Sequence, residues 1–144
     1  MLVSLVAATL MMSFVDATTM SFVDATTTES AKALQLYPIE NHLIERTNAE
    51  RTRRGLPALA IDLKLVKSAR DHAAWMTRTH TLRHTGRAVA ENIAMGQSSS
   101  SEAMRSWMNS SGHRANILRG SHSKIGVAAY TTPGGAIYWC QQFE

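Results

Sequence analysis

The stretch Ile125-Gly-Val-Ala-Ala-Tyr-Thr-Thr-Pro-Gly-Gly-Ala-Ile137-Tyr-Trp-Cys-Gln-Gln-Phe143 decides the fold class. Apolar residues take alternate positions in each half, as in strands that bury one face. Between the halves, Pro133, Gly134 and Gly135 supply strong turn chemistry. The stretch therefore predicts an antiparallel hairpin of two strands.

The sequence before this hairpin has helical spacing. Tyr37-Pro38 is suited to a first helical turn, and Gly55 with Pro57 closes that helix. Asp62 is a natural N-cap for a second helix, which ends before residue 84. Its inner stripe is Leu65, Val66, Ala69, Ala73 and Met76. Helices followed by a hairpin indicate an α+β fold, with helices packed against a small, mainly antiparallel sheet.

Three shorter pieces lie between the second helix and the hairpin. Residues 88–95 are expected to be extended. A capping box from Ser99 to Glu102 begins a third helix, whose apolar face is Met104, Trp107 and Met108. Ser110-Ser111-Gly112 is expected to interrupt it, and residues 113–118 to form one more short helix.

Composition limits the class of protein. The chain has 144 residues, 44% of them hydrophobic and 18% charged, which is typical of one globular domain with a proper core. The single cysteine, Cys140, excludes an internal disulfide. Because it lies in an apolar strand pattern, we expect a buried and inert thiol.

The net charge of +4 could suit an acidic partner. Its densest cluster, Arg51, Arg53 and Arg54, ends the first predicted helix, and we expect a solvated helix end with cations near the negative end of the dipole. Nucleic-acid binding is the alternative, but no binding motif accompanies these charges, so no nucleic-acid partner is predicted.

The first 36 residues are expected to lie outside the domain. Residues 1–25 are predicted to be an export signal, because 2–15 are apolar and uncharged, too few to span a membrane, and Val15-Asp16-Ala17 resembles a cleavage site. A basic start is missing, so a chain that begins at Met11, Met12 or Met20 is the alternative. Residues 12–19 recur unchanged at 20–27. Residues 26–36 are expected to be a linker and 37–144 the domain.

Three ionisable side chains stand beside breaks in regular structure, where sites are commonly built. His84 precedes Gly86 on a predicted loop, Glu91 lies in an otherwise apolar run, and His113 follows Gly112. Each alone suits an ordinary structural role. A shared cleft of all three is the functional hypothesis.

The ordered motifs from about residue 39 to 143 resemble the CAP superfamily of cysteine-rich secretory, antigen 5 and pathogenesis-related proteins, also called SCP domains, and in particular its disulfide-free bacterial branch. The motifs are Asn48-x-x-Arg51-x-x-x-Gly55-Leu56-x-x-Leu59, His84, Glu91-Asn92-Ile93, Trp107-x-x-Ser110, Gly112-His113-Arg114-x-Asn116-Ile117-Leu118, Ile125-Gly126-Val127 and Tyr138-Trp139-x-Gln141-x-Phe143.

The resemblance implies an α-β-α sandwich and a secreted or cell-surface location. It also implies a central cleft, in which eukaryotic family members hold two histidines and two glutamates and the histidines can bind a divalent metal such as zinc. His84 and His113 match the histidines and Glu91 the first glutamate, whereas Ser110 stands where the second glutamate would be. Asn48, Arg51, Asn92 and Asn116 match positions that we interpret as structural hydrogen-bonders.

Three functions follow from these residues. The first is a binding module without established catalysis, whose cleft of His84, Glu91, Ser110 and His113 takes a small hydrophobic ligand or a cell-wall or protein partner. The alternative is a divalent-metal-dependent hydrolase or protease with His84 and His113 as ligands of a weakly held zinc and Glu91 as base. A Ser110-His113-Glu91 hydrolase is a third, but no nucleophile-elbow sequence surrounds Ser110. We favour the first, and no transmembrane anchor is expected in the mature chain.

Overall fold

The structure, a computed structural model, describes residues 35–144. The predicted export signal, the duplication at 12–27 and most of the predicted linker lie outside the described residues. The domain boundaries therefore stay predictions.

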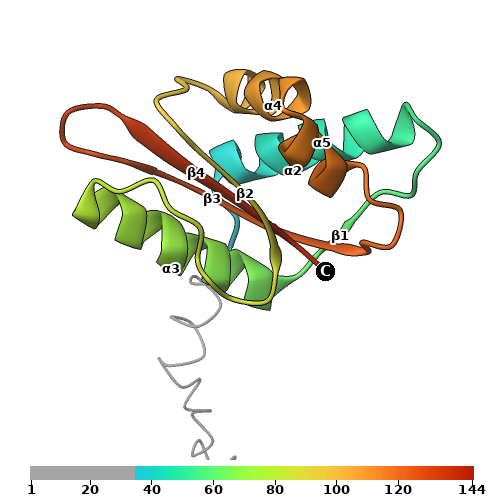
Figure 1. The fold of residues 1–144 in the computed structure, drawn as a ribbon, viewed down its shortest axis with the longest axis horizontal. Helices are drawn as coiled ribbons and strands as arrows, with labels where there is room; N and C mark the ends of the chain where they lie inside the picture. The colour runs from blue at the N-terminus through green and yellow to red at the C-terminus, as the bar shows by residue number, and fades with distance from the viewer. Residues whose placement is uncertain (1–34) are drawn as a thin grey trace, which may run out of the picture. The chain divides into compact units, whose positions relative to one another are not determined.

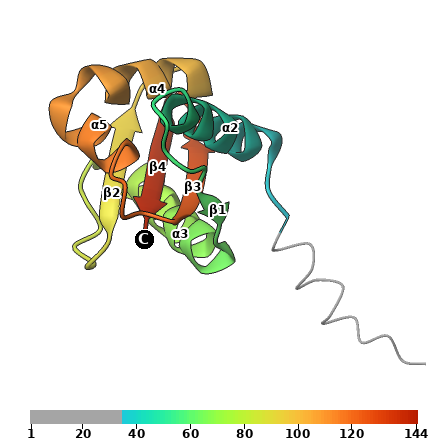
Figure 2. The same ribbon diagram turned by 90° about the vertical axis from the view of Figure 1, so that its right-hand side faces the viewer.

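The described residues form an α-β-α sandwich. In chain order its elements are α2 (Pro38–Thr52), β1 (Ala60–Ile61), α3 (Leu63–Thr79), β2 (Ala90–Met95), α4 (Ser100–Asn109), α5 (Ser111–Ile117), β3 (Lys124–Thr131) and β4 (Ile137–Phe143). Helices α2, α4 and α5 cover one face of the sheet and α3 covers the other (Figures 1 and 2). The predicted α+β architecture is confirmed.

Within the described part, the sheet has four strands in the order β1-β3-β4-β2. Strands β3 and β4 form the predicted antiparallel hairpin, and β2 pairs antiparallel with β4, with Glu91 opposite Gln142 and Asn92 opposite Gln141. Strand β1 pairs parallel with β3 and was not predicted, because two residues are too few to give a sequence pattern. The sheet is thus mainly antiparallel, as expected.

The helix ends follow from local capping. Asp62 Oδ1 accepts hydrogen bonds from the backbone N–H groups of Lys64 and Leu65, at 2.8 and 3.1 Å. Ser99 Oγ accepts one from Glu102 N at 3.3 Å. The carboxylate of Glu102 binds the backbone N–H and the hydroxyl of Ser98, so the predicted box closes one residue earlier than expected.

The predicted break at residues 110–112 needs a correction. Helix α5 begins at Ser111 and includes Gly112, so only Ser110, with an extended backbone at φ −100° and ψ 123°, separates it from α4. A glycine lowers the stability of a helix without preventing it from forming, and the helical residues on either side of Gly112 keep it in the helix here.

Two apolar cores lie on the two faces of the sheet. The larger one packs α2, α4 and α5 against β3 and β4 around the fully buried Trp107 and Trp139. The smaller one packs α3 against the sheet through Ala69, Ala73 and Met76, which lie on its predicted inner stripe. Cys140 belongs to the smaller core and is completely buried, as predicted.

Arg51 corrects the prediction of a solvated helix end. Its side chain is completely buried, and its guanidinium donates to the carbonyl oxygens of Pro57, Ile117, Arg119 and His122 at 2.9–3.2 Å. Only Arg53 and Arg54 are exposed there, and both pair with Glu50. Arg51 instead joins the end of α2 to the chain after α5, which agrees with its predicted structural role.

Asn48 has the same kind of role. Its amide donates to Leu59 O at 3.1 Å and accepts from Leu59 N at 2.8 Å, which fixes the chain just before β1.

In residues 35–144, no helix combines the length and apolar character needed to cross a bilayer.

Candidate functional site

The candidate site is built around Glu91, whose side chain lies on the α3 face of the edge strand β2 and is only 3% exposed. Oε1 accepts from His84 Nδ1 at 2.9 Å and from Thr85 N at 3.0 Å. Oε2 accepts from Gln142 Nε2 at 2.9 Å and lies 3.5 Å from Cys140 Sγ. Both oxygens of this carboxylate are therefore already occupied by donors of the protein.

These contacts keep Glu91 ionised. Burial alone would raise its pKa, but the hydrogen bonds from Gln142, Thr85 and His84, together with the nearby His72, lower the pKa below its ordinary value of 4.5. The charge of Glu91 in turn adds to burial in raising the pKa of the Cys140 thiol. Glu91 is thus a fixed anion at neutral pH, and Cys140 is a protonated thiol.

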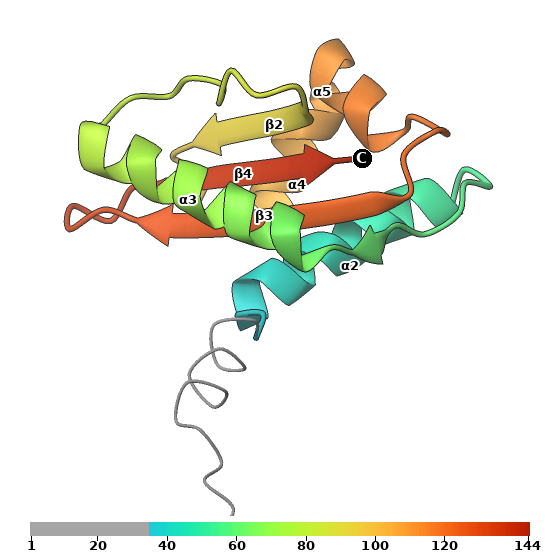
Figure 3. The ribbon, with the colours of Figure 1, turned by 90° about the horizontal axis from the view of Figure 1, so that it is seen from below.

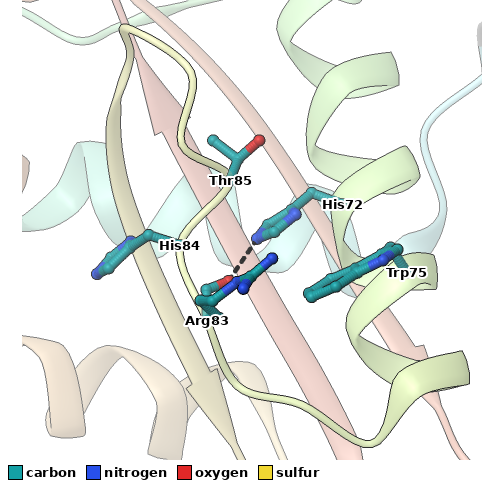
Figure 4. A pocket seen from close by; sticks show the side chains of 5 residues that line it. All are labelled: His72, Trp75, Arg83, His84 and Thr85. Carbon is teal, nitrogen blue, oxygen red and sulfur yellow. Dashed lines mark hydrogen bonds between the residues drawn. The ribbon is translucent and has the colours of Figure 1, made fainter.

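His84 is the exposed end of this arrangement. Its side chain is 59% exposed, and because a carboxylate can only accept, Nδ1 carries the proton that is donated to Glu91. In the neutral imidazole Nε2 is then unprotonated, and no hydrogen bond within residues 35–144 engages it. Figure 4 shows the His84 ring on the other side of its segment from Arg83, His72 and Trp75.

His113 lies half-buried near the start of α5. Its pKa is lowered by burial and, to a smaller extent, by the positive charge that His84 can carry, so His113 is neutral at pH 7. The amide of Asn92 donates to His113 O at 3.1 Å. That of Asn116 donates to Glu91 O at 3.2 Å and to Asn92 Oδ1 at 3.0 Å.

These amide bonds attach α5 to β2 and agree with the predicted structural roles of Asn92 and Asn116. His84 therefore contacts Glu91 directly, whereas His113 is held beside the same strand through its backbone.

Ser110, the nucleophile of the third hypothesis, does not form within residues 35–144 the contacts that this role requires. It lies between α4 and α5, its side chain makes no capping hydrogen bond, and none joins it to His84 or His113 among the described residues. The geometry supports neither a capping serine nor a serine activated as a nucleophile, which would need an adjacent base.

Two residues of the site were missed from the sequence. His72 on α3 is 9% exposed; its Nε2 is 2.8 Å from Arg83 O and 3.9 Å from Glu91 Oε1. Gln142, on β4, holds the second oxygen of Glu91. His72 lies three residues after Ala69 on the inner stripe of α3, so helical spacing alone could have shown it to face inward.

The donor set can be compared with what zinc requires. Catalytic zinc takes three protein ligands and leaves one position open. Among residues 35–144 no group of three or more His, Cys, Asp or Glu side chains is placed to hold a metal ion. His84 Nε2 and the neutral His113 ring would supply two ligands, with Glu91 orienting one of them. This set fits a weakly held cation and does not fit a three-ligand zinc centre.

Comparison with known proteins gives a consistent relationship. Residues 44–143 match the family model described as CAP, the cysteine-rich secretory protein family. The Bacillus subtilis protein YkwD is 37% identical over 121 residues, which covers 72% of this chain and 46% of YkwD. The chain therefore spans less than half the length of that curated relative.

Solved structures share the fold. An outer surface protein of Borrelia burgdorferi has a TM-score of 0.66 at 21% identity, covering 72% of this chain and 89% of that one. An extracellular SCP-domain protein of Bacillus anthracis has a TM-score of 0.63 at 27% identity, covering 76% of this chain and 44% of that one.

Proposed function

Since the chain belongs to the cysteine-rich secretory protein (CAP) family, we propose that it is an extracellular binding module whose ligand site is the cleft of His84 and His113. The observation that carries this proposal is the full occupation of the Glu91 carboxylate by its four neighbours. In the proposal Glu91 positions His84, and His84 presents Nε2 to the ligand.

This role of Glu91 favours binding over hydrolysis. A general base must have a lone pair within reach of the water it activates, and a pKa near the working pH serves it best. Glu91 has its oxygens engaged and a lowered pKa, so it is a poor base. Ser110 brings no second carboxylate, so nothing in the cleft replaces Glu91 in that function.

The two imidazoles suit two kinds of ligand. Their unprotonated ring nitrogens can hold a divalent cation weakly, or they can accept a hydrogen bond from a polar group of a small molecule or of a partner protein. A bound cation would supply a Lewis acid at Nε2 of His84. The protein's own contribution is the fixed tautomer and orientation of that ring.

Export of the chain is a further part of the proposal. The Bacillus anthracis and Borrelia burgdorferi neighbours are described as an extracellular protein and an outer surface protein. Residues 1–25, which the sequence predicts to be a signal, lie outside the described residues. Amino-terminal sequencing of protein recovered from the culture medium tests this part, because a cleaved signal leaves a start near residue 18 or 26.

Calorimetric titration with zinc chloride tests the cleft. We expect weak, saturable binding in the wild type and its loss in both His84→Ala and His113→Ala. His42→Ala is the matched control, because His42 is an exposed imidazole on α2. Equal binding by the wild type and both cleft variants would exclude these rings as the site.

A second measurement separates binding from catalysis. The zinc-loaded protein is incubated with casein and with a nitrophenyl ester, and turnover is compared with that of His84→Ala. Turnover that disappears in His84→Ala and in Glu91→Gln would overturn the non-catalytic proposal in favour of a metal-dependent hydrolase.

A further inference from the structure

Two depressions lie along α3, and His84, a residue of the proposed cleft, lines the first of them. Their volumes are about 270 and 370 Å³. The first lies between the later turns of α3 and residues 83–85, and the second between its first turns and residues 87–89. The segment 83–89 therefore runs antiparallel to the helix, as it returns toward β2 (Figure 3). We call this surface the α3 groove; the residues used below are Lys64, Ser68, Trp75, Arg83, Arg87 and Gln142.

The α3 groove carries positive charge. Lys64, Arg83 and Arg87 line it, and within residues 35–144 none of them forms an ion pair with a carboxylate. Lys67, one turn along the same helix but outside the groove, does pair with Asp71. The three groove cations are thus available to an acidic partner.

Arg83 is also held in place. Its guanidinium lies 5.2 Å above the centre of the Trp75 ring, a cation-π contact that uses none of its N–H donors. Figure 4 shows Arg83 on the α3 side of its segment with Trp75 and His72, opposite the ring of His84. Arg83 therefore lines the groove with N–H donors that its contact with Trp75 leaves available.

Gln142 gives the groove an unsatisfied acceptor. Its Nε2 donates to the Glu91 carboxylate, which fixes the orientation of the amide. Its Oε1 is buried and has no hydrogen-bond partner among the described residues, and Gln142 lines the larger depression. A buried acceptor without a donor is costly, so an N–H or O–H group that reaches it would be favoured.

We propose that the α3 groove binds an acidic peptide in an extended conformation. The lining residues of α3 extend from Lys64 to Trp75, which is about 16 Å of helix and matches about five residues of strand. The side-chain carboxylates of such a peptide pair with the three cations, and a backbone N–H reaches Oε1 of Gln142. Glu144 is the one acidic residue that lines the groove, and it lies at the end near Lys64.

A peptide suits this surface better than an acidic sugar chain. Sugar rings commonly stack on open aromatic faces, and the aromatic surface of the groove is Trp75. That ring already stacks on His72, at 5.7 Å between centroids, and lies under Arg83. The groove is left with charges and hydrogen-bonding groups, which an extended acidic peptide matches.

Fluorescence anisotropy tests the groove with fluorescein-labelled pentaglutamate, with pentaglutamine as the neutral match and labelled oligogalacturonate as the acidic sugar. We expect the acidic peptide alone to bind, and more weakly as salt is added. Arg83→Gln and Arg87→Gln should each weaken its binding about two- to fivefold. Arg46→Gln, an exposed cation on α2 across the sheet, should leave binding unchanged.

Ser68→Phe is a second test, because Ser68 is a half-buried lining residue of α3 and the larger ring would fill the groove. It should abolish peptide binding while the circular dichroism spectrum stays that of the wild type. Binding that the two arginine changes leave intact, equal binding of pentaglutamine, or preferred binding of oligogalacturonate would overturn the proposal. Zinc titration of the same variants reports cation binding at His84 and His113, so peptide binding and zinc binding can fail independently.

Discussion

Single polar residues hold this small domain together at points that the apolar cores do not reach. Arg51 is the strongest case, because one buried guanidinium satisfies four carbonyl oxygens from two separate loops. Burial lowers its pKa, yet an arginine keeps its charge at any working pH. The planar fork of five donors makes this possible, and a lysine could not reproduce it.

Arg51→Met is expected to lower the free energy of unfolding by about 3 kcal/mol or more, because it leaves several buried carbonyl groups without donors. Arg54→Met, four-tenths exposed and paired with Glu50, is the matched control and should change it by less than about 1 kcal/mol. Urea denaturation measures both. Equal changes in the free energy of unfolding would show that the buried guanidinium of Arg51 stabilises the fold no more than an exposed one.

Glu91 gives the fold a pH dependence whose sign can be derived. Its pKa is lower in the folded chain than the ordinary value of 4.5, so the unfolded chain takes up the proton first as pH falls. The resulting stabilisation is complete well above pH 4.5 and is lost as pH falls through the lowered pKa.

Glu91→Gln should therefore reduce stability at pH 7 by about 2 kcal/mol, because an amide NH₂ group would face donors where the carboxylate accepted charged hydrogen bonds. The deficit relative to the wild type should shrink between pH 5 and acid conditions in urea denaturation series. Glu45→Gln, exposed on α2, is the control and should follow the wild type at every pH. A deficit that stays constant with pH would contradict the lowered pKa.

At the scale of elements, the position of α3 depends on Gly126, a residue without a side chain. A Cβ added to Gly126 of β3 would lie 2.1 Å from Leu65 C and 2.3 Å from Val66 N, which are backbone atoms of α3. The first turn of the helix thus lies directly on the strand. This contact determines how closely α3 approaches the face of the sheet on which Glu91 and Gln142 lie.

Gly126→Ala is expected to lower the free energy of unfolding by about 3 kcal/mol, since backbone must move to admit the methyl group. Gly120→Ala is the matched control, because the nearest atom to its added Cβ is a side-chain carbon of Leu56 at 3.8 Å. Thermal unfolding compares the two. A tolerated alanine at position 126 would show that α3 does not pack as closely as described.

The whole molecule is stabilised without covalent cross-links, and its one thiol reports on its opening. Cys140 is completely buried, and burial together with the charge of Glu91 raises the pKa of its thiol well above the usual range. A thiol attacks reagents as the thiolate, so the folded protein should be inert.

Labelling with Ellman's reagent at pH 8 is expected to be negligible in the native protein and complete in guanidinium chloride. Gly126→Ala should accelerate native-state labelling, because a less stable fold opens more often. Rapid labelling of the native wild type would mean that the smaller core is accessible.

The sequence predicted most of the fold, for identifiable reasons. The hairpin of β3 and β4 and the stripe of α3 are long, periodic segments, and their patterns survive in the structure. Strand β1 has only two residues, which is too few for a sequence pattern. The break before α5 was predicted too late in the chain, because Gly112 was interpreted as a helix breaker although it lies within α5. The burial of Arg51 could not be predicted from a cluster of basic residues, because most of the carbonyl groups that bind it belong to residues 117–122, far away in the sequence.

The candidate site was predictable in part. His84, Glu91 and His113 were identified from their positions beside breaks and from family resemblance, and the structure brings His84 into contact with Glu91. Gln142 and His72 were missed because their importance depends on strand register and on the crossing of α3 over the sheet. These are properties of pairing between elements and not of local spacing.

The pairing of β2 with β4 has a consequence for how the chain avoids misassembly. Glu91 and Asn92 are consecutive and point to opposite faces, as do Gln142 and Gln141 opposite them, and each pair is closed by its own hydrogen bond. A slip of one residue would turn Glu91 into the apolar layer beneath Trp107 and leave four polar side chains without partners. These polar pairs between β2 and β4 therefore favour the observed register of the two strands over a register shifted by one residue.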